Sequence, residues 1–344
     1  MGNRKLSKRQ TQRIQSFQER QRKRASQKTS DHSLDDLTSL GPETTGIVIS
    51  NYGTQVDIEG DKVPFKGQLV RCFKRANIDT LVTGDNVVWQ PVEKNNKQTN
   101  GVVVALQPRE SELIRPDNYG KLRPVAANID RIGVVFSALP NPQSNLIDRY
   151  LVAAEAHNIE PFIVVNKSDL LADNDYPDML KLIDNYRFIG YEVICVSAKT
   201  KLGIDQLGRY LCDHTSIFVG QSGVGKSSMI NVLQPENNSA TGALSEATNE
   251  GTHTTTASKL VHLNDGGMLI DSPGIREFAL SHLDQETIIN SFRDFRPYLG
   301  KCKFRDCKHD KEVGCALLEA VVAGKVLDDR LKNYRQIMQS LNSF

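Results

Sequence analysis

The chain has 344 residues, of which 39% are hydrophobic, and a net charge of only +2 at pH 7. That length exceeds what one compact core holds, so we expect two or three domains. The sequence contains neither 18 consecutive apolar residues nor the apolar stretch of a secretory signal, which argues against membrane and secreted proteins and predicts a cytoplasmic one.

Residues 1–44 are expected to form a basic, disordered arm and linker. Residues 1–30 carry ten Lys and Arg against one Glu, so the rest of the chain is net acidic. Few large apolar side chains interrupt this segment, which predicts disorder when the arm is free. A flexible basic arm suits a polyanion, because each neutralised phosphate releases counterions. A tail that only aids solubility is the alternative.

Residues 45–112 contain five short segments rich in strand-forming residues, separated by turn sequences. The segments are Thr45–Ser50, Thr54–Glu59, Gln68–Phe73, Asn86–Pro91 and Gly101–Leu106. We expect an OB-type barrel, with an SH3-like barrel as the alternative. Basic residues such as Arg71 and Lys74 fit the nucleic-acid binding of OB folds. A barrel that only braces the next domain is the other interpretation.

Residues 113–280 alternate apolar segments with amphipathic ones, after a connector around Arg115-Pro116. The expected strands are Arg131–Ser137, Pro161–Val165, Glu192–Val196, Ser216–Gly220 and Gly267–Asp271, and the expected helices are Asn145–Ala156, Asp178–Tyr186, Ile204–Tyr210 and Lys226–Leu233. This alternation predicts an α/β domain with a mostly parallel sheet covered by helices on both faces.

Two motifs in this region are typical of guanine recognition. Asn166, Lys167 and Asp169 belong to Asn-Lys-Ser-Asp, which follows an apolar segment. The Asp169 carboxylate is expected to accept hydrogen bonds from guanine N1 and its exocyclic amine, which adenine cannot supply. The Lys167 stem would cover the base, and the backbone of Ser197-Ala198 would donate to guanine O6. These motifs predict a preference for GTP over ATP.

A phosphate-binding loop follows these motifs and lies between an expected strand and an expected helix. The nucleotide contacts expected here are Gly220, Gln221, Ser222, Gly223, Val224, Gly225, Lys226, Ser227 and Ser228. Glycines and a helix N-terminus let backbone N–H groups converge on phosphates. We expect Lys226 to act catalytically by bridging the β- and γ-phosphates, and Ser227 to coordinate Mg²⁺.

Asp271 and Gly274 form the Asp-x-x-Gly motif after the last apolar strand. Asp271 would lie in the outer shell of the magnesium ion, and the Gly274 N–H would meet the γ-phosphate. In familiar GTPases the phosphate loop precedes the base-reading motifs, whereas here it follows them. The order predicts a circularly permuted GTPase. Its pocket would still form, because every motif follows the carboxyl end of a parallel strand.

The segment before Asp271 is expected to supply the remaining catalytic groups. Either Thr254 or Thr255 should complete the magnesium shell, and we favour Thr255. Ile275 stands where familiar GTPases carry a water-orienting glutamine, so His253 is the nearest candidate for that role. An exposed loop histidine is the alternative. We expect slow intrinsic hydrolysis that a partner accelerates.

Residues 281–344 are expected to form a mainly helical, zinc-binding domain. Cys302, Cys307, His309 and Cys315 follow the pattern C-x4-C-x-H-x5-C, which offers a closed tetrahedral shell for one structural zinc ion. A disulfide or an unligated cluster is the alternative. The three other cysteines are expected to be buried free thiols. An apolar stripe between Leu327 and Leu341 predicts core packing, with a partner-binding face as the alternative.

From about residue 45 to the C-terminus, this motif order, the cysteine–histidine cluster and the expected barrel resemble the ribosome small-subunit-dependent GTPase A (RsgA, YjeQ) family of bacteria. The resemblance implies a cytoplasmic GTPase that acts late in maturation of the small (30S) ribosomal subunit. It also implies contacts of the barrel and zinc domains with 16S rRNA, hydrolysis stimulated by the subunit, and a catalytic role for His253. We expect GTP and GDP as ligands, no membrane partner and a monomer. An RNA-binding scaffold whose GTP site is structural, or a signalling GTPase, is the alternative.

Overall fold

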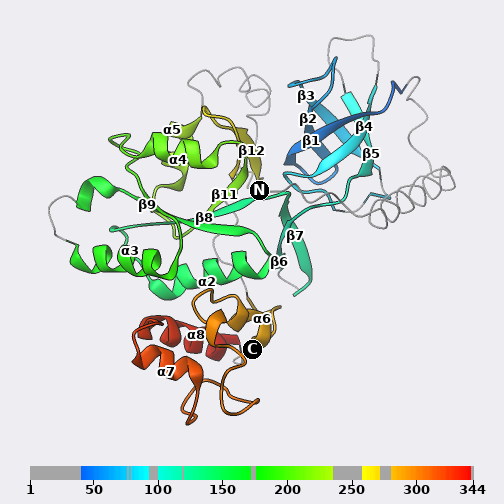
Figure 1. The fold of residues 1–344 in the computed structure, drawn as a ribbon. Helices are drawn as coiled ribbons and strands as arrows, with labels where there is room; N and C mark the ends of the chain where they lie inside the picture. The colour runs from blue at the N-terminus through cyan, green and yellow to red at the C-terminus, as the bar shows by residue number, and fades with distance from the viewer. Residues whose placement is uncertain are drawn as a thin grey trace. The chain divides into compact units, whose positions relative to one another are not determined.

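The computed structural model describes residues 40–341 except 76, 79, 93–99, 118–119, 172–175, 235–257 and 272–279. The chain divides into two compact units between Glu110 and Ser111, and Figure 1 shows the elements of each. Among the described residues, no helix has the length and apolar character that crossing a bilayer requires.

The first unit is a five-stranded barrel. Its strands are β1 (Thr44–Asn51), β2 (Gln55–Gly60), β3 (Leu69–Lys74), β4 (Asn86–Val92) and β5 (Asn100–Leu106). They follow the order β1-β2-β3-β5-β4, and β4 pairs back with β1 to close the barrel. The β3–β5 pair is parallel, whereas the other pairs are antiparallel. This arrangement confirms the predicted OB-type barrel.

Alternating side chains fill the barrel interior, as a half-buried strand requires. In β2 every second residue is buried, and the single tryptophan, Trp89, is fully buried against the ring of Phe65 at 5.1 Å. A Cβ at Gly101 would lie 2.6 Å from Cys72 Sγ, so only glycine fits there. Cys72 is buried as expected, whereas Cys195 and Cys212 are only partly buried, contrary to expectation.

The second unit contains the predicted parallel sheet. Its strands are β8 (Arg131–Ser137), β9 (Glu160–Asn166), β10 (Val193–Cys195), β11 (Thr215–Val219), β12 (Lys259–His262) and β13 (Met268–Asp271). They follow the order β10-β9-β8-β11-β13-β12, and only β12 runs antiparallel to its neighbour. The strands are almost continuously buried, as strands covered on both faces are.

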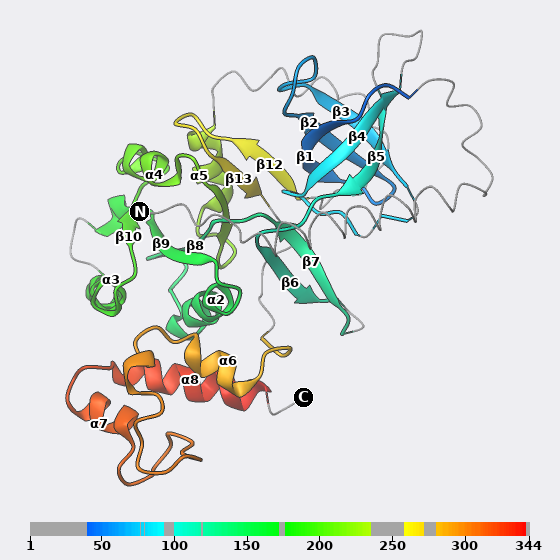
Figure 2. The same cartoon turned by 45° about the vertical axis from the view of Figure 1, so that its right-hand side comes forward.

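Four helices cover this sheet, two on each face (Figures 1 and 2). Helices α2 (Ser144–Ala156) and α3 (Pro177–Ile189) lie on one face, and α4 (Ile204–Leu211) and α5 (Lys226–Leu233) lie on the other. These helices and five of the six strands match the predicted segments to within a few residues. The carboxyl ends of the parallel strands therefore meet at one edge, where every nucleotide motif begins.

A hairpin that was not predicted precedes this sheet. Strands β6 (Glu112–Pro116) and β7 (Leu122–Ala127) pair antiparallel where the sequence analysis predicts only a connector. Pro116 and Pro124 lie within the two strands, and proline weakens the sequence signal of a strand. The short strand β12 was not predicted either.

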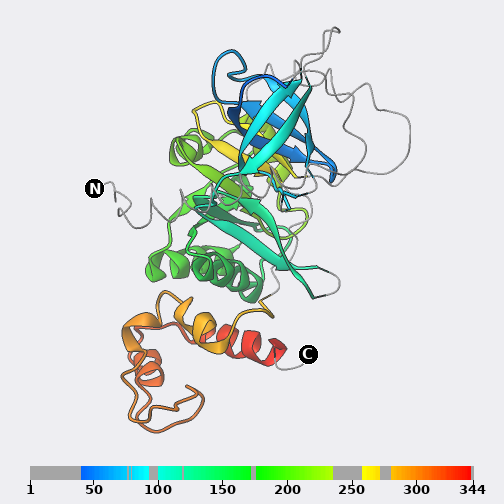
Figure 3. The same cartoon turned by 90° about the vertical axis from the view of Figure 1, so that its right-hand side faces the viewer.

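The C-terminal helices belong to the same compact unit as the parallel sheet. They are α6 (Gln285–Asn290), the 3-10 helix η4 (Arg296–Tyr298), α7 (Ala316–Val322) and α8 (Asp328–Leu341). Figure 3 shows α8 lying alongside α2. Leu331, Tyr334 and Ile337 of α8 are buried, which confirms the core-packing interpretation of the apolar stripe.

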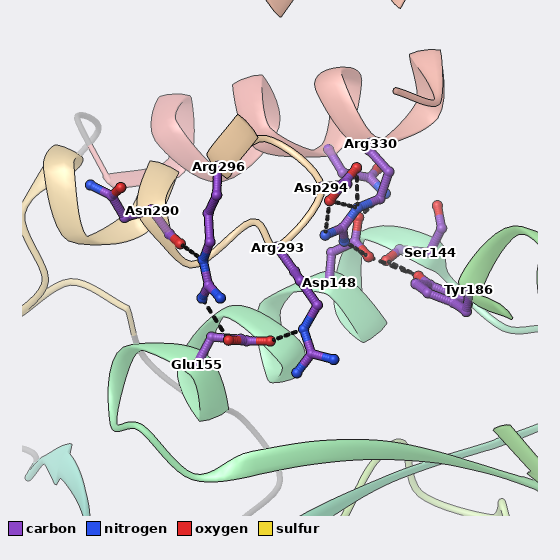
Figure 4. A network of polar contacts seen from close by, with 10 residues as sticks. Ser144, Asp148, Glu155, Tyr186, Asn290, Arg293, Asp294, Arg296 and Arg330 are labelled. Carbon is purple, nitrogen blue, oxygen red and sulfur yellow. Dashed lines mark hydrogen bonds and ion pairs between the residues drawn. The ribbon is translucent and has the colours of Figure 1, made fainter. Parts of the chain in front are cut away.

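Buried ion pairs fix α8 on helix α2 (Figure 4). The Arg330 side chain is 3% exposed and lies 2.5 Å from Asp148 of α2 and 2.9 Å from Asp294. Asp148 also accepts hydrogen bonds from Tyr186 Oη at 2.8 Å and Asn333 Nδ2 at 2.7 Å. Burial raises the pKa of Asp148, and these donors oppose that shift. A second carboxylate of α2 extends the contact.

That carboxylate is Glu155, which pairs with Arg293 at 2.8 Å and with Arg296 at 2.6 Å. Its side chain is 8% exposed, and the Arg293 guanidinium also lies over the Tyr191 ring. Helix α2 thus presents two carboxylates, about two turns apart, to arginines of the C-terminal region. Figure 4 shows both clusters on the same side of α2.

We expect Arg330→Ala to lower the free energy of unfolding by about 3 to 5 kcal/mol, because it leaves two buried carboxylates unpaired. Urea unfolding followed by circular dichroism measures this change. The matched control is Lys332→Ala on the same helix, since the Lys332 side chain is 59% exposed and pairs only with exposed acids. An equal loss of unfolding free energy in both variants would show that the buried cluster does not stabilise the fold more than exposed ion pairs do.

Candidate nucleotide site and metal centre

The predicted phosphate loop connects β11 to α5 at the carboxyl edge of the sheet. Gly220, Gly223 and Gly225 all have positive φ, a conformation that side chains with a Cβ rarely adopt. A Cβ at Gly220 would lie 2.1 Å from the Val135 carbonyl oxygen. The loop can therefore hold this path only with glycine at these positions.

The first turn of α5 carries the polar residues of the predicted phosphate site. Lys226 Nζ donates to the carbonyls of Gly220 at 2.7 Å and Gln221 at 2.9 Å, so the ammonium lies over the loop. Ser222, Ser227 and Ser228 are exposed, while Val224 is buried in the core below. The N-terminus of α5 therefore offers a position where an anion is stabilised, with these polar residues on it or just before it.

Asp271 ends β13, next to β11. Burial raises the pKa of Asp271, and the charge of Lys226 opposes the shift. Asp271 ends one strand of a parallel pair and Lys226 follows the other, so both lie at the carboxyl edge of the sheet. This is the arrangement expected of a magnesium outer-shell ligand beside a phosphate-binding lysine.

Asn166 connects three of the motifs through its buried side chain, which is 2% exposed. Its Nδ2 donates to the Val224 carbonyl in the phosphate loop at 2.8 Å, and its Oδ1 accepts from the Ala198 N–H at 3.1 Å. A Cβ at Gly225 would lie 2.3 Å from Nδ2. One amide therefore holds the phosphate loop and both base-reading segments together. Asn166 was predicted from its motif, but this role was not.

Lys167 bridges the phosphate loop and the loop after β8. Its backbone has φ of +60°, and its Nζ donates to the carbonyls of Leu139 at 2.6 Å and Gly223 at 2.8 Å. Leu139 lies in the loop after β8 and was not predicted. Its position after the carboxyl end of a parallel strand was the signal that could have identified it.

A cavity of about 320 Å³ opens between these segments. It is lined by Asn166, Lys167, Asp169, Leu170, Ser197, Ala198, Lys199, Gly225 and Ser228. Asp169 Oδ1 is buried and makes no hydrogen bond within the described part of the chain. A buried acceptor without a donor is costly, so this oxygen fits a ligand that supplies N–H groups. Leu170 was not predicted.

Several predicted residues lie outside the described residues. They are His253, Thr254, Thr255 and Gly274. The described part of the site therefore comprises the base-reading segments, the phosphate loop and Asp271.

The predicted zinc ligands come together in the loops before α7. The Sγ atoms of Cys302, Cys307 and Cys315 and a ring nitrogen of His309 all lie within 4.8 Å of one another. His309 Nδ1 is 3.6, 3.7 and 3.3 Å from the three sulfurs, and Cys302 Sγ lies 3.9 Å from Cys315 Sγ. Tetrahedral zinc with Zn–S bonds of about 2.3 Å separates sulfurs by about 3.8 Å. The residues therefore fit zinc, and all three thiols are free.

Comparison with known proteins identifies the family. A family model described as RsgA GTPase matches residues 106–281. The protein named small ribosomal subunit biogenesis GTPase RsgA from Hahella chejuensis (strain KCTC 2396) is 50% identical, with 99% of this chain and 97% of the relative covered. The protein of that name from Ectopseudomonas mendocina (strain ymp) is 49% identical, with coverage of 99% and 98%. The chain belongs to the RsgA GTPase family.

Solved structures agree with this assignment. The chain resembles YloQ, described as a circularly permuted GTPase, with a TM-score of 0.66, 30% identity and coverage of 91% of this chain and 98% of YloQ. It also resembles YjeQ from Thermotoga maritima, with a TM-score of 0.71, 28% identity and coverage of 88% and 100%. The predicted family, fold class, GTPase activity and circular permutation are thus confirmed.

We expect Asn166→Ala to weaken binding of GDP and GTP about 10- to 100-fold, because the Val224 carbonyl and the Ala198 N–H lose their shared partner. Titration with a fluorescent GDP analogue measures the change. Asn264→Ala is the control, since the Asn264 amide bonds an exposed carbonyl of Gln234. Unaltered affinity in Asn166→Ala would show that the three segments assemble without the amide.

Proposed function

We propose that this member of the RsgA GTPase family binds GTP with Mg²⁺ at the site around Asn166 and hydrolyses it while acting on the small ribosomal subunit. The main support for a nucleotide site here is the buried Asn166 amide, which joins the phosphate loop to both base-reading segments. GDP would remain in the same pocket after hydrolysis.

Some of the predicted residues would contact the guanine base, and the others would contact the phosphates. Asp169 would accept from guanine, the Lys167 stem would cover the ring, and the Ser197-Ala198 backbone would donate to O6. The unpaired, buried Asp169 Oδ1 supports that role. The phosphates would lie against Gly220, Gln221, Ser222, Gly223, Val224, Gly225, Lys226, Ser227, Ser228 and Gly274.

Magnesium would be coordinated by Ser227 and Thr255, with Asp271 in the outer shell. When bound, the ion neutralises charge on the phosphates. Lys226 would stabilise the charge that develops on the transferred group, and His253 would orient the attacking water. Ile275 stands where a glutamine would otherwise hold that water, which is why the reaction needs a histidine or a partner's group.

The proposed action on the small ribosomal subunit is inferred from the similar proteins. The curated proteins named above are small ribosomal subunit biogenesis GTPases, and they match this chain over nearly its whole length. The barrel also presents exposed side chains that suit RNA. Tyr52 and Phe73 are each 46% exposed, and the Arg71 guanidinium lies over the Tyr52 ring. Aromatic and arginine faces stack on bases, so we propose that the barrel contacts 16S rRNA.

We also propose a structural metal, four domains and a location for this protein. Cys302, Cys307, His309 and Cys315 would hold one structural zinc ion. The domains would be a basic arm and linker (1–44), a barrel (45–112), a GTPase domain (113–280) and a zinc domain (281–344). The protein would act as a cytoplasmic monomer without a membrane partner, and the basic arm would add charge attraction to RNA.

We expect isolated small subunits to accelerate GTP hydrolysis by the purified protein at least tenfold, because a partner would help position the group that orients the attacking water. Lys226→Ala should abolish the stimulated rate, since the γ-phosphate loses its lysine. His253→Ala should slow the stimulated rate without weakening GTP binding. Phosphate release with small, large or no subunits measures these rates.

The matched control is Lys181→Ala, an exposed lysine on α3. Its stimulated rate should equal that of the wild type. Equal rates with large and small subunits would contradict the proposed partner. Equal recovery of the protein with small subunits in GTP, in GDP and without nucleotide would instead favour an RNA-binding scaffold.

A further inference from the structure

The histidine of the metal cluster has an unusual backbone conformation. His309 has φ of +58°, in the left-handed region that residues with a Cβ seldom occupy. It lies between Cys307 and Cys315, and its Nδ1 faces all three sulfurs. Contacts outside the ligand set must therefore hold this residue in the ligating conformation.

One such contact comes from Glu312 in the same loop. Its Oε1 accepts the Lys308 N–H at 2.9 Å, and its Oε2 accepts the N–H groups of Asp310 at 2.8 Å and Lys311 at 3.1 Å. The carboxylate thus binds backbone on both sides of His309. Three N–H bonds to one carboxylate define the path of a loop that has no regular secondary structure.

The second contact comes from α8. Arg335 Nη2 donates to the carbonyls of His309 at 3.1 Å and Asp310 at 2.6 Å. Helix α8 lies between the metal-binding loops and α2 (Figures 1 and 3). Arg330, five residues earlier on the same helix, is the buried partner of Asp148 in α2. Arg335 therefore links the ligand loop to a helix that is itself fixed on the GTPase sheet.

We propose that Glu312 and Arg335 are positioning residues of the metal centre: they hold the His309 backbone so that Nδ1 completes the shell made by the three thiolates. Neither side chain is a ligand. Glu312 shapes the loop, and Arg335 joins it to α8. Partners outside the ligand set commonly determine metal affinity by orienting the ligands. This inference rests on the proposed zinc site.

The test uses the full-length protein and four variants. Glu312→Gln keeps the size of the side chain but replaces an accepting oxygen with a donor, and Arg335→Met keeps the stem but removes the donors. Arg335→Lys retains a donor. Lys332→Met, on the same helix, is the control, because Lys332 pairs only with the exposed Asp328 and Asp329. Competition with a chromophoric chelator measures zinc affinity, and Co²⁺ absorption reports ligand geometry.

We expect zinc affinity to fall about 10- to 100-fold in Glu312→Gln and Arg335→Met. The Co²⁺ spectrum of both should lose intensity in its tetrahedral bands, Arg335→Lys should recover part of the affinity, and Lys332→Met should match the wild type. GTP affinity should not change in any variant, which separates loss of positioning from loss of the fold.

Zinc affinities within twofold of the wild type, together with an unaltered Co²⁺ spectrum in Glu312→Gln, would overturn the inference while leaving the zinc site intact. Glu312 lies outside α8, so this variant decides the question even if Arg335→Met fails to fold. A wild-type protein that binds neither zinc nor Co²⁺ would instead overturn the zinc assignment itself.

Discussion

The candidate nucleotide site depends on one buried amide, that of Asn166. Segments far apart in the chain reach it because each follows the carboxyl end of a parallel strand, and the amide then bonds the phosphate loop on one side and the Ala198 backbone on the other. Such a site requires proximity in space and not a particular chain order. This is why the rotated order of motifs leaves the pocket intact, and why Gly225, packed against Asn166 Nδ2, tolerates no side chain.

Circular permutation has a mechanical consequence at the other end of the domain. The Asp-x-x-Gly motif that begins at Asp271 is soon followed by the C-terminal helices, the first of which, α6, begins at Gln285. Those helices are held on α2 by the Arg330–Asp148 and Arg293–Glu155 contacts. Both ends of the intervening segment are therefore attached to the same compact unit.

Much of the architecture could be predicted from the sequence, and the exceptions have physical causes. The apolar strands of the parallel sheet other than β12, and the amphipathic helices between them, carry a strong sequence signal, and Cys302 to Cys315 follow a ligand spacing. The β6–β7 hairpin was missed because prolines weaken its signal. Leu139 was missed because its backbone carbonyl, and not its side chain, meets Lys167. The Arg330 cluster joins residues up to 185 positions apart, a pairing that no local pattern encodes.

The central claim is that one pocket selects guanine through Asp169. Isothermal titration of the nucleotide-free protein with GTP and with ATP, for the wild type and for Asp169→Ala, tests it most directly. The account predicts a single site in the wild type that prefers GTP by about 10⁴-fold or more, and a collapse of this preference in Asp169→Ala. Equal affinity of the wild type for both nucleotides, or an unchanged preference in the variant, would contradict it.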